Sequence, residues 1–256
     1  MADSAAPPPV ESTNFGVESH GKILLAGITL KLSPNRILAI IGPSASGKSL
    51  FLRCINRLCE LTGPLVTTGQ MLVFGADVYA PGTDVMALRR RVGMVFSKPS
   101  LPVAGIFDNV AMAPRLAGIH DKGALAEIVE RHLRQVGLWD ALAARLGTPA
   151  AALTAEQQQR LCIARVLAAD PAILLFDEPT AHLDYPSAGH IEDLIIALAK
   201  TRAVIVAAQT PQQASHVAEE TAFFWDGRLV ESGPTTDVLT NPRDPRTEAY
   251  ITGRTA

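Results

Sequence analysis

One short stretch of the chain has residues of the types and spacing that bind phosphate. It is the segment Gly42-Pro43-Ser44-Ala45-Ser46-Gly47-Lys48-Ser49, which matches the P-loop pattern G-x-x-x-x-G-K-[ST] at every fixed position. The two glycines let the backbone turn tightly, so that successive N–H groups form a concave anion site. Lys48 can reach the β- and γ-phosphates of ATP, and the Ser49 hydroxyl can ligate Mg²⁺. The segment therefore predicts a site for ATP and Mg²⁺.

The residues on either side of this loop predict the strand and helix that a P-loop requires. Residues 36–41 are a short, mostly apolar run, as expected of a buried strand. Residues 49–58 have apolar side chains at helical spacing. The positive N-terminal end of that helix would add to the attraction for phosphate.

A second set of candidate residues follows another apolar run. Residues 173–176 are all apolar and are followed by Asp177 and Glu178. In P-loop enzymes such a strand carries carboxylates to the phosphate site, where Asp177 would hold Mg²⁺ and Glu178 would orient or deprotonate the attacking water. The alternative is an acidic strand end that faces solvent.

Composition indicates a globular protein. The 256 residues are 48% hydrophobic, so a sizeable core can form. A net charge of −2 gives no electrostatic case for nucleic acid, which is therefore not an expected partner. No stretch approaches the about 18 apolar residues of a membrane-spanning helix. The cysteines Cys54, Cys59 and Cys162 have no metal-binding or redox spacing, and we expect them in the core.

The order of the elements predicts one α/β domain. Residues 1–12 are rich in alanine, proline and serine and predict a disordered tail, so the domain would span residues 13–256. Strands that alternate with helices indicate a mostly parallel sheet. A helical subdomain is expected over residues 98–170. Strands are predicted at 15–19, 22–32, 70–74, 91–96, 172–177 and 203–208, helices at 124–136 and 155–167, and a hairpin at 221–231 around Asp226-Gly227.

Together these motifs resemble those of ABC-transporter ATPase subunits, most closely the ATP-binding subunit of bacterial phosphate importers. The similarity runs from about Gly21 to Arg254. The resemblance implies a P-loop NTPase fold, RecA-like, with a mostly parallel sheet, an antiparallel β edge and an inserted helical subdomain. Local matches are Phe51-Leu52-Arg53-Cys54, Gly93-Met94-Val95-Phe96, the segment from Gln157 to Arg165, and the segment from Thr247 to Arg254.

The resemblance also implies partners and a location. In that family two ATPase subunits enclose two ATP molecules between the P-loop of one subunit and the signature motif of the other. The pair docks on membrane-spanning permease subunits. We therefore expect a second ATPase subunit, identical or homologous, and permease subunits as partners. The expected location is the cytoplasmic face of the bacterial inner membrane, with peripheral attachment.

Several positions depart from the family's pattern. Ser97 stands where the Q-loop glutamine is expected, and Gln209 stands where the switch histidine is expected. The LSGGQ signature is replaced by Leu153-Thr154-Ala155-Glu156-Gln157. The D-loop, Ala181-His182-Leu183-Asp184, keeps its aspartate. The aromatic residue that stacks on adenine has no clear counterpart, and His20 is the nearest candidate. By resemblance, Gln209 joins Glu178 in catalysis, and His20, Ser97, Thr154, Gln157 and Asp184 contact the nucleotide.

These departures leave three functions open. The first is an ATP-hydrolysing subunit that energises an importer, for inorganic phosphate. The second is a catalytically weak ATP-binding subunit with a regulatory or structural role that pairs with an intact homologue. This alternative arises because Ser97 is too short to reach both metal and water, and because Glu156 could place negative charge against phosphate. Glu156 could also point to solvent at the start of its helix. The third is an ABC protein with a task other than transport.

Overall fold

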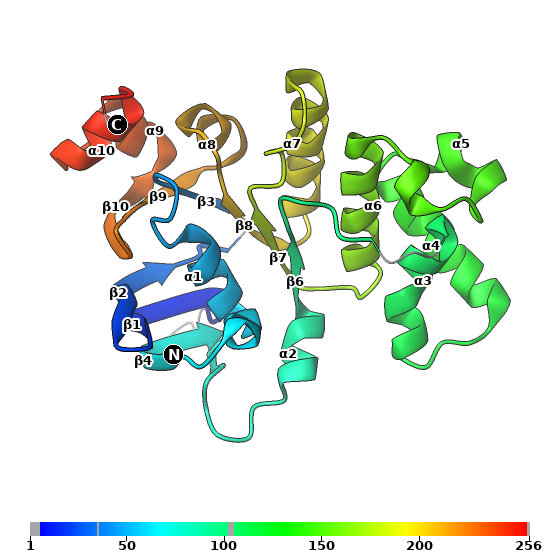
Figure 1. Cartoon of the computed structure of the whole chain (residues 1–256), viewed down its shortest axis with the longest axis horizontal. Helices are drawn as coiled ribbons and strands as arrows, with labels where there is room; N and C mark the ends of the chain where they lie inside the picture. The colour runs from blue at the N-terminus through cyan, green and yellow to red at the C-terminus, as the bar shows by residue number, and fades with distance from the viewer. Residues whose placement is uncertain (1–5, 35, 102–104, 255–256) are drawn as a thin grey trace, which may run out of the picture.

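The central sheet of the protein has six strands, and five of them are parallel (Figure 1). The computed structural model describes residues 6–34, 36–101 and 105–254. The strand order is β10-β9-β3-β8-β7-β6, and β10 runs antiparallel to β9 at one edge. The strands are β3 (Ile37–Ile41), β6 (Val92–Val95), β7 (Ile173–Asp177), β8 (Ala203–Ala207), β9 (Glu220–Trp225) and β10 (Arg228–Pro234).

The strands at the centre of this sheet are buried on both faces. Every residue of β3 and β7 is buried, which explains why both read as unbroken apolar runs rather than as alternating patterns. Parallel strands present their carboxyl ends at one edge of the sheet, where α/β proteins bind ligands. The loops that begin at Gly42, Glu178 and Ala208 therefore start at the same edge.

A second, four-stranded antiparallel sheet lies beside the first. The prediction of a disordered tail through Ser12 is wrong for residues 10–12, because β1 begins at Val10 and pairs with both β2 and β4. Residues 1–5 of the predicted tail lie outside the described part of the chain. The strands, in the order β2-β1-β4-β5, are β1 (Val10–Ser19), β2 (Lys22–Lys31), β4 (Val66–Val73) and β5 (Ala76–Asp77).

Most of the helices between β6 and β7 gather at one side of the molecule, away from the antiparallel sheet (Figure 1). The helices of this group are α3 (Ile106–Leu116), α4 (Lys122–Gln135), α5 (Trp139–Leu142) and α6 (Ala155–Leu167), with short 3₁₀ turns η2 (Ala143–Arg145) and η3 (Ala150–Ala152). The side chains of Asp121 and Thr154 accept hydrogen bonds from backbone N–H groups and so fix where α4 and α6 begin. Asp184 and Thr210 do the same for two later helices, α7 (Tyr185–Ala199) and α8 (Pro211–Val217).

The remaining helices cover the two faces of the central sheet. The alternation of side chains along β3 divides the apolar core, because Ile37 and Ile41 pack on one side while Leu38 and Ile40 pack on the other. The core on the first side includes side chains of α7 and α8 and continues into α3, α4 and α6, and the core on the second side includes side chains of α1 and the antiparallel sheet. The further helices are α1 (Lys48–Ile55), η1 (Leu58–Thr62), α2 (Val85–Arg91), α7 (Tyr185–Ala199), α8 (Pro211–Val217), α9 (Thr235–Thr240) and α10 (Pro245–Ile251).

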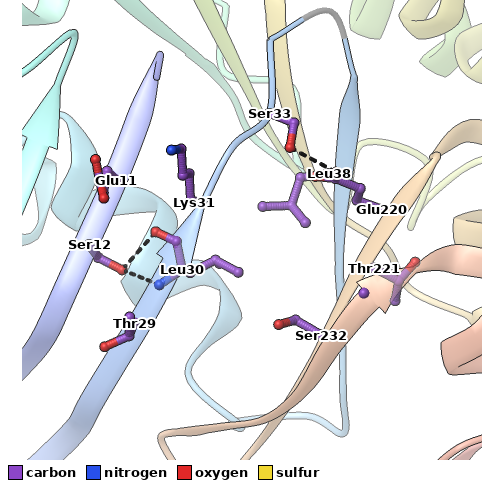
Figure 2. A pocket seen from close by; sticks show the side chains of 11 residues that line it. Glu11, Ser12, Thr29, Leu30, Lys31, Ser33, Leu38, Glu220, Thr221 and Ser232 are labelled. Carbon is purple, nitrogen blue, oxygen red and sulfur yellow. Dashed lines mark hydrogen bonds between the residues drawn. The ribbon is translucent and has the colours of Figure 1, made fainter. Parts of the chain in front are cut away.

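A cavity of about 410 Å³ lies between the two sheets, at the amino ends of β3 and β9 (Figure 2). Its polar side chains bond mainly to neighbouring groups of the protein. Ser12 Oγ accepts from the Leu30 N–H at 3.1 Å, and Ser33 Oγ donates to Glu220 Oε1 at 2.8 Å. No P-loop residue lines this cavity, so it is separate from the predicted phosphate site at the other end of the strands.

Candidate nucleotide site

The P-loop has the backbone conformation that its glycines were expected to allow. Gly42 has φ 147° and Gly47 has φ 102°, both in the region that favours glycine. A Cβ atom on Gly42 would collide with the carbonyl oxygen of Phe224, and one on Gly47 would lie 2.6 Å from Leu25 Cδ2. The loop thus packs closely against β9 and β2. Its last two residues, Lys48 and Ser49, form the start of α1.

Lys48 lies inside the loop rather than in solvent. Its Nζ donates to the carbonyl oxygens of Gly42 at 2.8 Å and Pro43 at 3.0 Å. It also lies 3.4 Å from Glu178 Oε1, and only 6% of its side chain is exposed. The Ser46 Oγ nearby is buried and has no hydrogen-bond partner among the described residues. A cation, an unpaired hydroxyl and free N–H groups at a helix start are together the features that bind a phosphate chain.

Ser49 and Asp177 meet as the two motifs predicted. The Ser49 hydroxyl donates to Asp177 Oδ1 at 2.6 Å, although 128 positions separate the two residues. Hydroxyl and carboxylate oxygens are the hard ligands that Mg²⁺ prefers, and Mg²⁺ usually takes one or two protein ligands together with phosphate oxygens. Within the described ranges no group of three or more His, Cys, Asp or Glu side chains gathers as a metal site. The pair therefore fits Mg²⁺ that arrives with a nucleotide.

Glu178 has a backbone conformation that is unusual for a residue with a side chain. Its φ is 48°, in the left-handed region, and its N–H donates to the Ala207 carbonyl at 3.0 Å. Such a conformation costs about 1–3 kcal/mol and is common at active sites. It lets the chain turn sharply after β7 while the carboxylate stays beside Lys48.

Two residues of this site were not predicted. Arg53 Nη2 lies 3.5 Å from Asp177 Oδ2, and its guanidinium lies 5.9 Å from the centre of the Phe96 ring. Arg53 follows Ser49 by four positions, so helical spacing could have revealed that the two share a face. Tyr250 Oη donates to the Gly42 carbonyl at 3.3 Å, and burial raises the pKa of this tyrosine. No sequence signal links Tyr250 to the loop.

A cavity of about 310 Å³ lies at this site. Asp177 and Tyr250 do not line it; its lining consists of the P-loop from Ala45 to Ser49 together with Leu24, Leu50, Arg53, Thr62 and Glu178. None of its lining residues comes from the helices between β6 and β7. His20 lies outside the lining, in the exposed turn between β1 and β2.

Ser97 lies two residues after β6 ends at Val95, and it does not line the cavity. The Phe96 carbonyl accepts a hydrogen bond from Gln159 Nε2 at 2.9 Å. Gln159 belongs to α6, so this contact joins the residue before Ser97 to the helix that begins within the segment 153–157.

The segment 153–157 forms a well-capped helix start. Thr154 Oγ1 accepts from the Gln157 N–H and Gln157 Oε1 accepts from the Thr154 N–H, both at 3.2 Å, which is a capping box. Thr154 and Ala155 are exposed. The carboxylate of Glu156 is 2.6 Å from Arg160 Nη2 and 2.9 Å from His190 Nδ1, and 23% of its side chain is exposed.

Gln209 and Asp184 lie near α7 and α8. The Gln209 N–H donates to Gln213 Oε1 at 2.9 Å, and the Gln209 side chain is exposed at a cavity of about 640 Å³ between α7 and α8. Asp184 caps α7, and hydrogen bonds from Ser187 hold the pKa of its carboxyl below the usual range. Within one chain, the structure thus brings together the P-loop, Asp177 and Glu178, but not Thr154, Gln157, Asp184 or His20.

The comparisons with known proteins agree with this fold. Residues 25–181, more than half of the chain, match the model of the ABC transporter family. The chain therefore belongs to the ABC transporter family and has its P-loop NTPase fold. This membership implies that it binds and hydrolyses ATP.

Two solved structures show how far the similarity extends. CbiO1 from Clostridium perfringens, part of the ABC transporter complex CbiONQ, is 21% identical with a TM-score of 0.80, and the match covers 97% of each chain. A bacterial Atm1-family ABC exporter with ATP bound is 25% identical with a TM-score of 0.80; the match covers 100% of this chain and 44% of the exporter chain. Among the described residues, no helix has the length and apolar character needed to cross a membrane.

Proposed function

We propose that this chain is the ATP-hydrolysing subunit that energises an ABC importer, with inorganic phosphate as the transported solute. The observation that carries the ATPase role is that the P-loop and the carboxylates of Asp177 and Glu178 come together within one chain. Ser49 contacts Asp177 at 2.6 Å, and Lys48 lies 3.4 Å from Glu178. The residues expected to bind phosphate, metal and water thus already contact one another within one chain.

In this proposal each residue has a defined part in the reaction. The P-loop N–H groups and Lys48 bind the phosphates, and bound Mg²⁺, held by Ser49 and Asp177, would neutralise charge that develops on them. Glu178 accepts the proton of the attacking water or orients it. Gln209 follows β8 at the same edge of the sheet. It is the proposed hydrogen-bond donor to the transferred phosphoryl group, since other P-loop enzymes use a glutamine amide in this step.

One finding supports membrane subunits as partners: CbiO1, which this chain matches over 97% of each chain, is part of the ABC transporter complex CbiONQ. The importer type rests on the sequence resemblance. Phosphate as the solute rests on the local sequence matches alone, including the segment from Thr247 to Arg254. The proposed partners are permease subunits and a second ATPase subunit, at the cytoplasmic face of the bacterial inner membrane. In such a pair Ser97, Thr154, Gln157, Asp184 and His20 would complete the nucleotide contacts.

The test combines binding, hydrolysis and uptake. The purified chain should bind Mg-ATP in calorimetry and release phosphate from ATP in a steady-state assay. Deleting its gene should lower uptake of radioactive phosphate, and the wild-type gene should restore it. The gene carrying Glu178→Gln should not. Normal phosphate uptake after deletion would exclude phosphate as the solute, and ATP binding without measurable turnover would favour the regulatory alternative.

A further inference from the structure

Glu156 is the centre of a polar cluster that joins two helices. Its Oε1 lies 2.6 Å from Arg160 Nη2 and 2.9 Å from His190 Nδ1, and its Oε2 accepts from Ser187 Oγ at 3.4 Å. Arg160 is on α6 with Glu156, whereas Ser187 and His190 are on α7. Three donors from two helices therefore converge on one carboxylate.

This cluster is more than a surface ion pair. Only 23% of the Glu156 side chain and 19% of the Arg160 side chain are exposed, so solvent screens them less than it screens exposed pairs. Arg160 Nε is buried with no hydrogen-bond partner among the described residues. Removing Glu156 would leave the Arg160 guanidinium partly buried without its carboxylate, which is a costly arrangement.

The other side of α7 makes a second set of contacts. Glu192 Oε1 accepts from Gln213 Nε2 at 3.0 Å, and the same Nε2 donates to Thr180 Oγ1 at 2.8 Å. Gln213 is only 6% exposed, and its Oε1 accepts from the Gln209 N–H at 2.9 Å. Gln213 thus fixes the backbone of Gln209 with its oxygen and reaches α7 with its nitrogen.

The helical geometry of α7 separates these two sets of contacts. Ser187 and His190 are three residues apart and share a face. Glu192 is two residues beyond His190, which places it on a different face, about 200° around the helix. Figure 1 shows α7 standing between α6 and α8, and α7 contacts both helices. One rigid helix therefore links the segment 153–157 to the loop of Gln209.

We propose that Glu156 is a positioning residue that fixes the segment 153–157 to α7, so that this segment and the Gln209 loop move as one body. This inference rests on the proposed function for its catalytic consequence. Glu156, which replaces a glycine of the family pattern, then links two helices. Its negative charge is neutralised by Arg160 within the chain rather than directed at phosphate. Catalysis would depend on the link because Gln209, which the proposed function places in catalysis, is held to α7 through Gln213.

The first experiment needs no nucleotide. Amide hydrogen exchange by mass spectrometry compares the wild-type chain with Glu156→Ala and with the matched control Glu130→Ala. Glu130 forms an i,i+4 pair with Arg134 at 2.7 Å, but that pair stays within the exposed surface of α4. For Glu156→Ala we expect exchange to be about fivefold faster or more at residues 155–160 and also at Gln209. Glu130→Ala should change neither region.

A second pair of variants tests the α7 side of the link. His190 is 58% exposed in its side chain, so His190→Ala should fold and should raise exchange at both regions by a smaller factor. His190→Asn retains a donor near the Nδ1 position and should restore the wild-type rates. If Glu156→Ala raises exchange only within α6, or if it affects Gln209 no more than Glu130→Ala does, the link to Gln209 does not exist. If Glu156→Ala does not fold, the His190 pair decides the same question.

The catalytic consequence is measured separately. If the chain turns over ATP, His190→Ala should lower kcat severalfold while the Kd for Mg-ATP stays unchanged, and His190→Asn should recover kcat. Coupled exchange in a chain that does not hydrolyse ATP would refute the proposed function and leave the link standing. If His190→Ala shows faster exchange at Gln209 but a normal kcat, the link does not position Gln209 for catalysis. That result would overturn this part of the proposal.

Discussion

The P-loop region and the segment 153–157 belong to the same site in the proposed dimer, yet they differ in how they are held within one chain. The P-loop contacts β7 through the Ser49–Asp177 hydrogen bond and α10 through the hydrogen bond from Tyr250 to the Gly42 carbonyl, and Lys48 is nearly buried. The segment 153–157 leaves Thr154 and Ala155 exposed and binds Glu156 to a different helix. The first region is complete in the isolated chain, whereas the second is shaped by contacts with α7. Binding of ATP should therefore be robust, and turnover should depend on the second region.

The largest expected effect separates turnover from binding. Glu178→Gln removes the carboxylate that would accept a proton and keeps nearly the same size, so we expect kcat to fall by about 10²–10⁴-fold. The Kd for Mg-ATP should change little, because the P-loop is untouched. A steady-state phosphate-release assay with calorimetry on the same sample measures both. An unchanged kcat would show that Glu178 is not the base and that the activity has another source.

The second prediction concerns a variant in which three positions that depart from the family pattern are changed to match it. Ser97→Gln, Ala155→Gly and Gln209→His together should raise turnover by about 10²-fold, the scale of regaining one donor to the developing charge. Glu156 is left unchanged in this variant because it holds α6 to α7. Adding Glu156→Gly should remove part of the gain. If the triple variant turns over at the wild-type rate, these three positions do not limit catalysis.

The third prediction concerns Lys48, which carries the positive charge of the P-loop. Lys48→Ala removes a charge-assisted contact to the phosphates, typically worth about 1.5–3 kcal/mol, so the Kd for ATP should rise by about 10- to 150-fold. Lys98→Ala, at an exposed position outside the cavity, is the control and should leave the Kd unchanged. Equal affinities in all three proteins would place ATP elsewhere on the molecule.

The sequence predicts the first region better than the second for a physical reason. The strand, the glycine loop and the helix of the P-loop are adjacent in the chain, and each has its own local pattern. Asp177 follows an apolar strand, so its place at the sheet edge could also be deduced. The predicted helix at 155–167 agrees with α6, and the Asp226-Gly227 hairpin is also confirmed.

The partners of Glu156 could not be predicted in this way. His190 is 34 positions from Glu156, and no periodic pattern indicates that α7 packs against α6 at that level. The sequence suggested two orientations for Glu156, toward phosphate or toward solvent, and neither named Arg160 or His190 as its partners. The strand residues 10–12 were missed for a similar reason. Their alternating pattern is short, and pairing with β2 and β4 outweighs the preference of a proline-rich tail for disorder.

The smallest expected effect tests whether the C-terminal helix belongs to the first region. Tyr250→Phe removes the hydroxyl that donates to the Gly42 carbonyl at 3.3 Å and keeps the ring, which lies 5.2 Å from the ring of Phe223. A neutral hydrogen bond contributes about 0.5–1.5 kcal/mol, and Lys48 still donates to the same carbonyl. We therefore expect the Kd for Mg-ATP to rise about two- to tenfold in calorimetry, with little change in thermal stability. Tyr250→Ala also removes the ring contact and should lower the melting temperature as well. If Tyr250→Phe binds ATP with wild-type affinity while Tyr250→Ala only unfolds more readily, Tyr250 supports the fold of α10 and takes no part in shaping the P-loop.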